Sequence, residues 1–158
     1  MIQIVKDSDT RPWFFLQTAH TTYGMWVMET GHLEHLYYGE RITADSQDPS
    51  SCAPLVIQRA FAPGNTCTYD REHPQISMED VCLEVGTLGK GDIREPFLEV
   101  RFTDGSVTSD FTFDSYEVIT LKEREQCLQA SGLPRSYSEA ETDSAECLQI
   151  VLQDVTNH

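Results

Sequence analysis

Three side chains that could bind a metal ion lie within four residues of one another, at His32, Glu34 and His35. Zinc is bound by imidazole nitrogens and carboxylate oxygens, and on a helix His32 and His35 would share one face. The apolar and aromatic neighbours favour a strand instead, on which His32 and Glu34 point to one face and His35 to the other. The helical zinc motif also spaces its histidines four residues apart. We therefore interpret these side chains as surface or cross-strand polar residues and predict no metal site.

A phosphate-binding loop is the chemistry suggested by the two glycines of residues 89–96, GKGDIREP. A Walker loop would continue into Lys-Ser or Lys-Thr and then a helix, and this segment does neither. We predict a turn in which glycine allows a positive φ, with the Arg94–Glu95 region paired to neighbouring residues.

Catalytic residues cannot be assigned from local motifs. The chain has 26 aspartates and glutamates, and glycoside hydrolysis needs two carboxylates on opposite sides of the scissile bond. Nothing distinguishes one pair among them. The sequence also lacks the Gly-x-Ser-x-Gly motif of acyl hydrolases and any recognisable Cys–His signature. We predict no catalytic residue.

The overall composition limits the class of partner and the compartment. A net charge of −15 and a pI of about 4.5 argue against nucleic acid and anionic membrane surfaces as partners. No apolar run approaches the roughly 18 residues of a membrane span, and the N-terminus becomes charged too early for a signal peptide. We therefore predict a cytoplasmic protein. Its odd number of cysteines, without a Cys-x-x-Cys pair, indicates reduced and mostly buried thiols at Cys52, Cys67, Cys82, Cys127 and Cys147.

The elements that must position these residues are mainly strands. Alternation of apolar and polar residues predicts strands at residues 1–5, 14–18, 22–28, 32–36, 37–42, 117–121 and 148–152. The turn Thr103-Asp104-Gly105-Ser106 between the alternating segments 98–102 and 107–113 predicts a β-hairpin, because glycine accepts the positive φ of a tight turn.

Helical signals are few, and the fold class follows from that. Ser77 could cap one turn at residues 77–80, and residues 122–130 contain good helix formers. Residues 44–66 and 136–146 are predicted loops. Many short strands predict an all-β fold, an antiparallel β-sandwich with little helix. Because residues 153–158 resemble a turn toward a further strand, we expect a fragment whose unpaired sheet edge promotes self-association.

Six short strings together carry a family resemblance: TAHTTY (18–23), GHLEHLYYG (31–39), GNT (64–66), GKGDIREP (89–96), SGLP (131–134) and LQIVLQD (148–154). In this order and spacing they resemble the N-terminal domain of bacterial α-galactosidases of glycoside hydrolase family 36. The resemblance covers almost the whole chain. It implies that residues 1–158 form a truncated N-terminal β-supersandwich, with the catalytic (β/α)8 barrel and the C-terminal β-domain outside this chain.

The resemblance also implies an activity for the complete enzyme. It would hydrolyse terminal α-D-galactosyl residues of raffinose- or melibiose-type sugars with retention, using two barrel aspartates and no metal or nucleotide cofactor. Family members are commonly tetramers, so a homo-oligomer is expected. The family's nucleophile follows a Lys-Trp-Asp string, whereas Trp13 and Trp26 precede Phe14 and Val27. A barrel also needs roughly 250 residues. We therefore expect these residues alone to be inactive and to serve assembly and shaping of a neighbouring subunit's active site.

The resemblance implies that the loop of residues 44–66 lies near the active site of a neighbouring subunit. Within it Asp48, Arg59 and Asn65 best match the family's substrate-binding pattern, although the sequence around Asp48 departs from it. Arginine and carboxylate side chains can fix sugar hydroxyls, or these residues can simply shape the loop. The alternative function is a free-standing carbohydrate-binding module, which would display a row of aromatic rings. Trp13 and Trp26 instead fall in predicted strands and resemble core residues.

Overall fold

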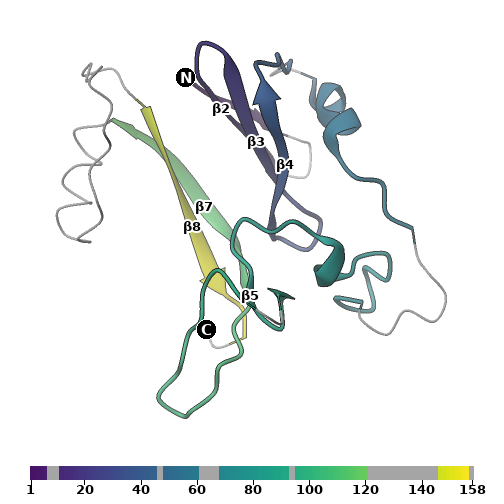
Figure 1. The fold of residues 1–158 in the computed structure, drawn as a ribbon, viewed down its shortest axis with the longest axis vertical. Coiled ribbons are helices and arrows are strands. Elements are labelled where there is room, and N and C mark those ends of the chain that lie inside the picture. Colours follow the sequence, from purple (N-terminus) through teal and green to yellow (C-terminus); the bar gives the residue numbers. More distant parts are fainter. Residues whose placement is uncertain (7–10, 46–47, 61–67, 93–94, 121–145, 157–158) are drawn as a thin grey trace.

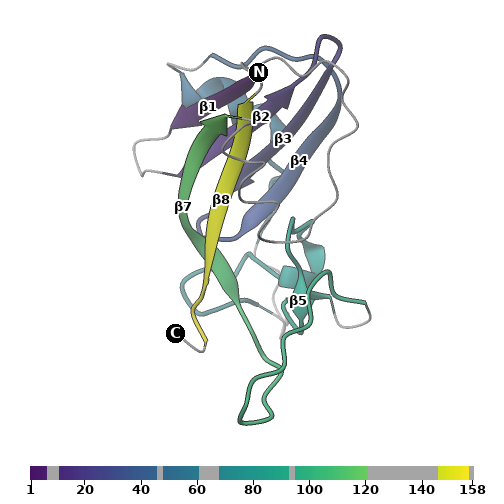
Figure 2. The same cartoon turned by 90° about the vertical axis from the view of Figure 1, so that its left-hand side faces the viewer.

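The computed structural model describes residues 1–6, 11–45, 48–60, 68–92, 95–120 and 146–156. Its first layer is an antiparallel sheet with the strand order β1-β2-β3-β4, made of β1 (Ile2–Lys6), β2 (Pro12–Gln17), β3 (Thr21–Val27) and β4 (Leu33–Glu40). The second layer is an antiparallel pair, β7 (Phe111–Thr120) and β8 (Glu146–Asp154). Figure 2 shows this pair lying across one face of the four-stranded sheet. The predicted all-β sandwich is confirmed.

The helical content of these ranges is small. It consists of two 3₁₀-helices, η1 (Pro49–Leu55) and η2 (Met78–Asp80), which lie beside and below the sheet (Figure 1). Ser77 takes the predicted N-cap position of η2, but its side chain makes no capping hydrogen bond. A short parallel pair, β5 (Thr87–Leu88) with β6 (Gly91–Asp92), follows. Neither of the two described helices could span a lipid bilayer.

The main core lies between the two layers. Phe14, Met25, Val27 and Leu33 are buried on the inner face of the sheet. The β7–β8 pair covers them with Phe113, Tyr116, Leu148, Ile150 and Leu152. The ring of Phe14, which is fully buried, meets the ring of Tyr116 edge-on at a centroid distance of 5.1 Å. These side chains point inward from the two layers and pack against each other, which holds the layers together as a sandwich.

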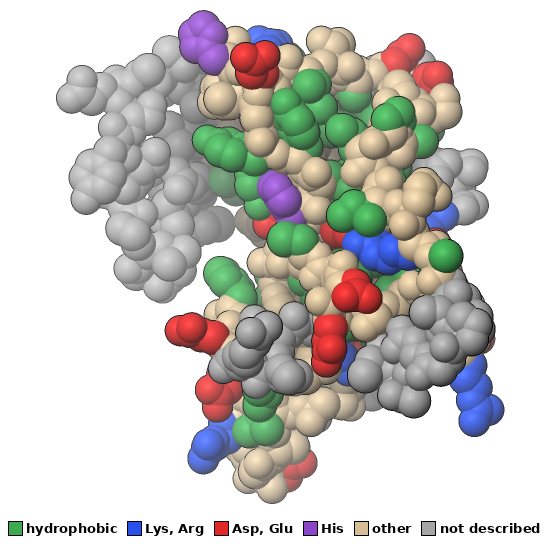
Figure 3. Space-filling model, turned by 45° about the vertical axis from the view of Figure 1, so that its right-hand side comes forward, with side chains coloured by type: hydrophobic (Ala, Val, Ile, Leu, Met, Phe, Trp, Pro, Cys, Tyr) green, Lys and Arg blue, Asp and Glu red, His purple; other side chains and the backbone are tan. Residues whose placement is uncertain are grey.

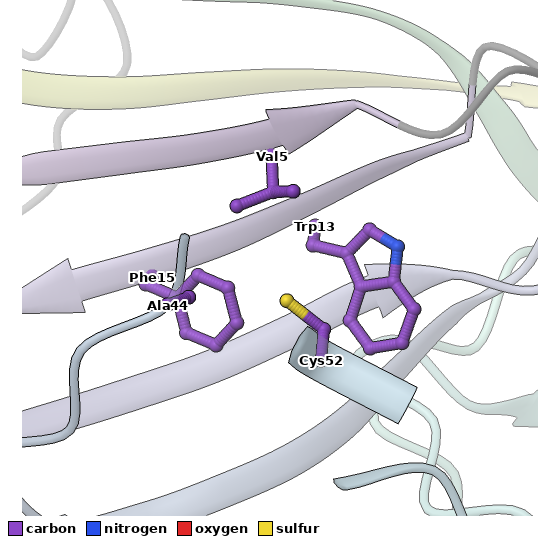
Figure 4. Close-up of a cluster of buried hydrophobic side chains, with 5 residues drawn as sticks. All are labelled: Val5, Trp13, Phe15, Ala44 and Cys52. Carbon is purple, nitrogen blue, oxygen red and sulfur yellow. The ribbon is translucent and has the colours of Figure 1, made fainter. Parts of the chain in front are cut away.

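A second core covers the opposite face of the sheet. Figure 4 shows Val5, Trp13 and Phe15 of the sheet meeting Ala44 and Cys52, and Cys52 belongs to η1. Strand β2 is therefore covered on both faces, which explains its nearly continuous apolar sequence. The contact of Cys52 with this core holds η1 on the outer face of the sheet.

Two of the predicted strands form one. Residues 32–36 and 37–42 were expected as separate strands, but β4 runs unbroken from Leu33 to Glu40. Gly24 pairs with Tyr37 and Met25 pairs with His35, so Leu36 is an extra residue opposite β3. This β-bulge turns the side chain of Leu36 toward the second core while the ladder continues.

The predicted hairpin at residues 98–113 is wrong in its strands and right in its turn. Gly105 has φ +88°, and Phe102 N–H donates to the Ser106 carbonyl at 2.9 Å. The flanking residues form no ladder in the described chain; instead β7 begins at Phe111 and absorbs the predicted strand 117–121 up to Thr120. A favourable turn does not suffice where the better partner, β8, lies elsewhere.

The predicted turn at residues 89–96 is confirmed at its start. Gly89 has φ +78°, and Thr87 and Lys90 exchange two backbone hydrogen bonds. Arg94, together with the predicted features at residues 122–130 and 136–145, lies outside the described residues.

Gly31 in the β3–β4 turn is a position where alanine should be costly. Its φ is +83°, and an added Cβ would lie 3.2 Å from Thr112 Cβ. We expect Gly31→Ala to lower the free energy of unfolding by about 2–4 kcal/mol, from backbone strain and crowding together. Urea denaturation followed by tryptophan fluorescence measures this loss.

Gly105→Ala is the matched control. Gly105 has the same kind of φ, but a Cβ there would meet no atom within 4 Å. Its loss should therefore be only about 1–2 kcal/mol. Equal losses in the two variants would show that the contact with Thr112 is unimportant.

Candidate functional site

Glu34 in β4 is the most deeply buried acidic side chain of the described residues, with an exposed fraction of 0%. Trp26 Nε1 donates to its Oε2 at 2.8 Å. Arg59 donates through Nη2 to Oε1 at 2.5 Å and through Nη1 to Oε2 at 3.4 Å. Arg59 Nη2 also donates to the carbonyl of Asp80 at 3.3 Å. The Glu34–Arg59 pair thus joins β3, β4, the segment after η1, and η2.

The chemistry open to Glu34 follows from these contacts. Both of its oxygens accept hydrogen bonds, and the Arg59 side chain that covers it is only 12% exposed. A general acid or base must reach a substrate proton, directly or through water. Glu34 is instead arranged as the buried half of a bidentate ion pair, which fixes geometry strongly.

A second buried pair joins the start of β4 to the start of β7. His32 and Asp110 are 2% and 4% exposed, and His32 Nε2 lies 2.7 Å from Asp110 Oδ1. Tyr69 donates to the other oxygen of Asp110 at 3.0 Å, and Lys90 Nζ lies 3.5 Å from it. Burial and the neighbouring Asp110 raise the pKa of Tyr69 to about 12, so its hydroxyl stays protonated and remains a donor.

Thr30, His32 and Asp110 are linked in the sequence hydroxyl, imidazole, carboxylate, which resembles a catalytic triad. Thr30 Oγ1 lies 2.9 Å from His32 Nδ1, on the opposite side of the ring from Asp110. A triad nucleophile must be open to an acyl group and must face an oxyanion hole. Thr30 is only 9% exposed, and the ring of Tyr69 packs edge-on against His32 at 4.9 Å. This network therefore holds segments together.

The His32–Asp110 pair makes stability depend on acidity. Burial alone raises the pKa of Asp110, but hydrogen bonding and the charges of His32 and Lys90 outweigh it, so the pKa is lowered. Ionised Asp110 therefore stabilises the fold above its unfolded-state pKa of about 3.9, and this contribution is lost as the pH falls through the lower folded-state value.

We expect the free energy of unfolding to fall on acidification below about pH 4, and to fall less steeply in Asp110→Asn. Urea denaturation of both proteins between pH 3 and 7 measures the two slopes. Parallel curves would contradict a stabilising ionised Asp110.

His35 points to the opposite face of β4 from Glu34, as predicted. Its Nδ1 lies 3.3 Å from Glu84 Oε1, and its ring packs on Tyr23 at 4.8 Å. Tyr23 donates to Glu84 at 2.7 Å, and burial followed by this hydrogen bond raises the pKa of Tyr23. Of the two interpretations offered for this stretch, surface position is wrong for His32 and Glu34, because both are buried. The cross-strand interpretation holds for Glu34, which accepts a hydrogen bond from Trp26, the residue opposite it on β3. Within the described ranges no group of three His, Cys, Asp or Glu could hold a metal ion.

The three predicted substrate-binding residues have different surroundings. Asp48 is exposed and caps η1, accepting from Ser50 N–H at 3.0 Å. Arg59 is turned inward onto Glu34, and its Nε is buried without a hydrogen-bond partner. Asn65 lies outside the described residues. Contact of these residues with a sugar stays a prediction.

The cysteines are partly as predicted. Cys52, Cys82 and Cys147 are free thiols; Cys52 is buried, Cys82 exposed and Cys147 half-buried. Burial raises the pKa of Cys52, which keeps it a neutral core side chain. Cys67 and Cys127 lie outside the described residues.

These observations define a two-layered, all-β domain whose buried carboxylates Glu34 and Asp110 lie in internal ion pairs. The chain belongs to the family described as the glycosyl hydrolase family 36 N-terminal domain, which matches residues 31–158. The resemblance drawn from the sequence strings is therefore confirmed.

Curated relatives of the chain are α-galactosidases. It is 35% identical over 142 residues to the bifunctional α-galactosidase/sucrose kinase AgaSK of Mediterraneibacter gnavus, covering 89% of this chain and 14% of that protein. It is 30% identical over 141 residues to α-galactosidase AgaA of Geobacillus stearothermophilus, covering 89% of this chain and 18% of that protein. The chain thus spans less than a fifth of the length of these relatives.

Solved structures give the same result for the fold. The α-galactosidase of Lactobacillus brevis matches with a TM-score of 0.71 and 27% identity, covering 96% of this chain and 18% of that one. A variant of AgaA from G. stearothermophilus, solved in complex with stachyose, matches with a TM-score of 0.69 and 26% identity, covering 91% and 18%. The sandwich is the N-terminal portion of a known architecture.

Proposed function

We propose that this chain is the non-catalytic N-terminal domain of an α-galactosidase that releases terminal α-D-galactosyl residues from raffinose- or melibiose-type sugars. The observation that carries the proposal is the family match together with the state of the buried carboxylates. Glu34 is paired to Arg59 and Asp110 to His32, so neither is available to a glycosidic bond. The AgaA complex with stachyose supports the substrate class. The catalytic pair would lie in a barrel outside these residues.

The domain's contribution in this proposal is to present the segment 48–59 to a neighbouring subunit's active site. The segment is fixed on one side by Cys52, which is fully buried, and on the other by Arg59. Between and beside these points Asp48 and Ile57 remain exposed. A rigid loop with an exposed carboxylate can hold sugar hydroxyls by directed hydrogen bonds.

Assembly into a homo-oligomer, a tetramer in the complete enzyme, is part of the same proposal. Ile57, Phe97 and Tyr38 are 60%, 78% and 71% exposed. Figure 3 shows hydrophobic side chains reaching the surface over the upper half of the face it presents. We expect the isolated chain to self-associate at high concentration, and sedimentation as a 17.9 kDa monomer throughout would contradict this.

The cytoplasm is the compartment we propose. The described free thiols Cys52, Cys82 and Cys147 support it, because reducing compartments keep thiols unpaired. Fractionation of cells expressing the complete protein tests it, and recovery outside the cytoplasm would overturn it.

The substrate-facing role is tested in the complete protein with Asp48→Asn, which keeps a capping side chain on η1. Loss of the charged acceptor should raise the KM for raffinose about tenfold. This factor corresponds to the binding free energy that one hydrogen bond to a charged group typically contributes. Glu99→Gln removes a charge that is also exposed, from a different segment, and should leave the KM unchanged. An unchanged KM in Asp48→Asn would remove Asp48 from the site.

The alternative function, a free-standing carbohydrate-binding module, would require exposed aromatic rings on which a sugar can stack. Trp13 is 5% exposed and packs on Trp26 at a centroid distance of 4.8 Å, so its ring offers no flat face to a sugar. Titration of the isolated chain with galactose or raffinose should give no saturable binding. Millimolar or tighter binding would favour the module.

A further inference from the structure

We propose that Glu34 is a positioning residue: it holds Arg59, and through Arg59 the segment 56–59 with its exposed residues Ile57 and Gln58, in the position that the active site of the complete enzyme requires. This inference rests on the proposed function of the 48–59 segment. It assigns a role to a side chain in β4, outside the loop that is expected to meet the sugar.

The exposure pattern along the segment indicates where it is held. Ile57 is 60% exposed and Gln58 is exposed, whereas the Arg59 side chain is only 12% exposed. Upstream, Leu55 and Val56 pack on the core that contains Cys52. The chain therefore projects into solvent at Ile57 and Gln58 and turns inward again at Arg59. The contact that holds it there is the ion pair of Arg59 with Glu34.

The geometry of the ion pair makes it a directional anchor. The guanidinium donates two hydrogen bonds to the two oxygens of Glu34, which sets the plane of Arg59 as well as its distance. Glu34 is itself oriented by Trp26 Nε1, and the Trp26 ring is backed by Trp13. An apolar contact in this place would hold the segment near the sheet without fixing its direction.

The same pair reaches a third segment. Arg59 Nη2 donates to the carbonyl of Asp80 in η2, and Cys82 and Glu84 of the chain that follows pair with residues of β4 through backbone hydrogen bonds. Glu34 therefore lies where the loop after η1, the sheet and the segment after η2 meet. Substitution of Glu34 should therefore loosen the loop, residues 56–60, more than it loosens the sandwich core.

The experiment compares Glu34→Gln with Asp110→Asn in the complete protein. Both substitutions remove a buried charge with little change of shape, but only Glu34 contacts Arg59. Two quantities are measured for each variant under conditions where circular dichroism shows the native fold: amide hydrogen exchange of residues 56–60, and KM and kcat for raffinose.

Glu34→Gln should speed exchange in residues 56–60 at least tenfold and raise the KM about tenfold with kcat within twofold, leaving exchange in β1–β3 unchanged. Asp110→Asn should change neither the exchange of residues 56–60 nor the KM. Arg59→Lys, which keeps the charge but not the two-point contact, should fall between wild type and Glu34→Gln, and it replaces Glu34→Gln if that variant does not fold.

Unchanged exchange of residues 56–60 in Glu34→Gln, or an equal effect of Asp110→Asn on the KM, would overturn the inference. Faster exchange with an unchanged KM in both Glu34→Gln and Asp48→Asn would instead overturn the proposed function of the segment. The two failures are therefore distinguishable.

Discussion

Replacing Arg59 with methionine should lower the free energy of unfolding by about 3–5 kcal/mol, although Arg59 lies in a loop. The reason is its partner: Glu34 is fully buried and would lose the positively charged side chain with which it is paired. Removing one member of a buried ion pair leaves an uncompensated charge in a medium of low dielectric constant. Urea denaturation at neutral pH, followed by fluorescence of Trp13 and Trp26, measures the loss.

The double variant Glu34→Gln/Arg59→Met is the matched control. Because it removes the buried charge together with its partner, it should be more stable than Arg59→Met alone. A loss below about 1 kcal/mol in Arg59→Met, the range of a surface salt bridge, would show that the pair contributes little. A double variant no more stable than Arg59→Met would point to lost packing of the arginine instead.

Phe14→Ala should lower the free energy of unfolding by a similar amount, about 3–5 kcal/mol. Phe14 has an exposed fraction of 0% and lies between the two layers, with its ring 5.1 Å from that of Tyr116 and 6.2 Å from that of Phe113. Truncation removes apolar contacts on both layers and leaves a cavity that the sheets can close only in part. The same denaturation experiment measures it.

Phe97→Ala makes the same chemical change at a position that is 78% exposed, and it should alter the stability by no more than about 0.5 kcal/mol. If both variants lost the same free energy, the β7–β8 pair would not be packed on Phe14 as described.

The local elements were largely predictable from the sequence. Strands β1, β2, β3 and β8 appear within about two residues of the expected positions, because alternation and turn signals act over a few residues. The family resemblance added the domain's identity, which no local pattern could supply. The errors occurred where a distant partner decided the outcome, as in β7, whose ladder with β8 includes only residues 111–113 of the expected hairpin.

The candidate site was much less predictable. Glu34 and Arg59 are 25 residues apart in sequence, and His32 and Asp110 are 78 apart. Neither pair has a local signature, since each is created when the sheet places one member against a segment that arrives later in the chain. The sequence therefore suggested surface or cross-strand polar residues, whereas the fold buries His32 and Glu34 against partners from later segments.

In the proposed function the buried carboxylates of this domain hold its structure, and cleavage of a galactoside needs polypeptide outside these 158 residues. The most direct test is to incubate the purified chain, shown by circular dichroism to be folded, with p-nitrophenyl α-D-galactoside. We expect hydrolysis no faster than in buffer. Saturable turnover that is abolished by Glu34→Gln or Asp110→Asn would contradict it.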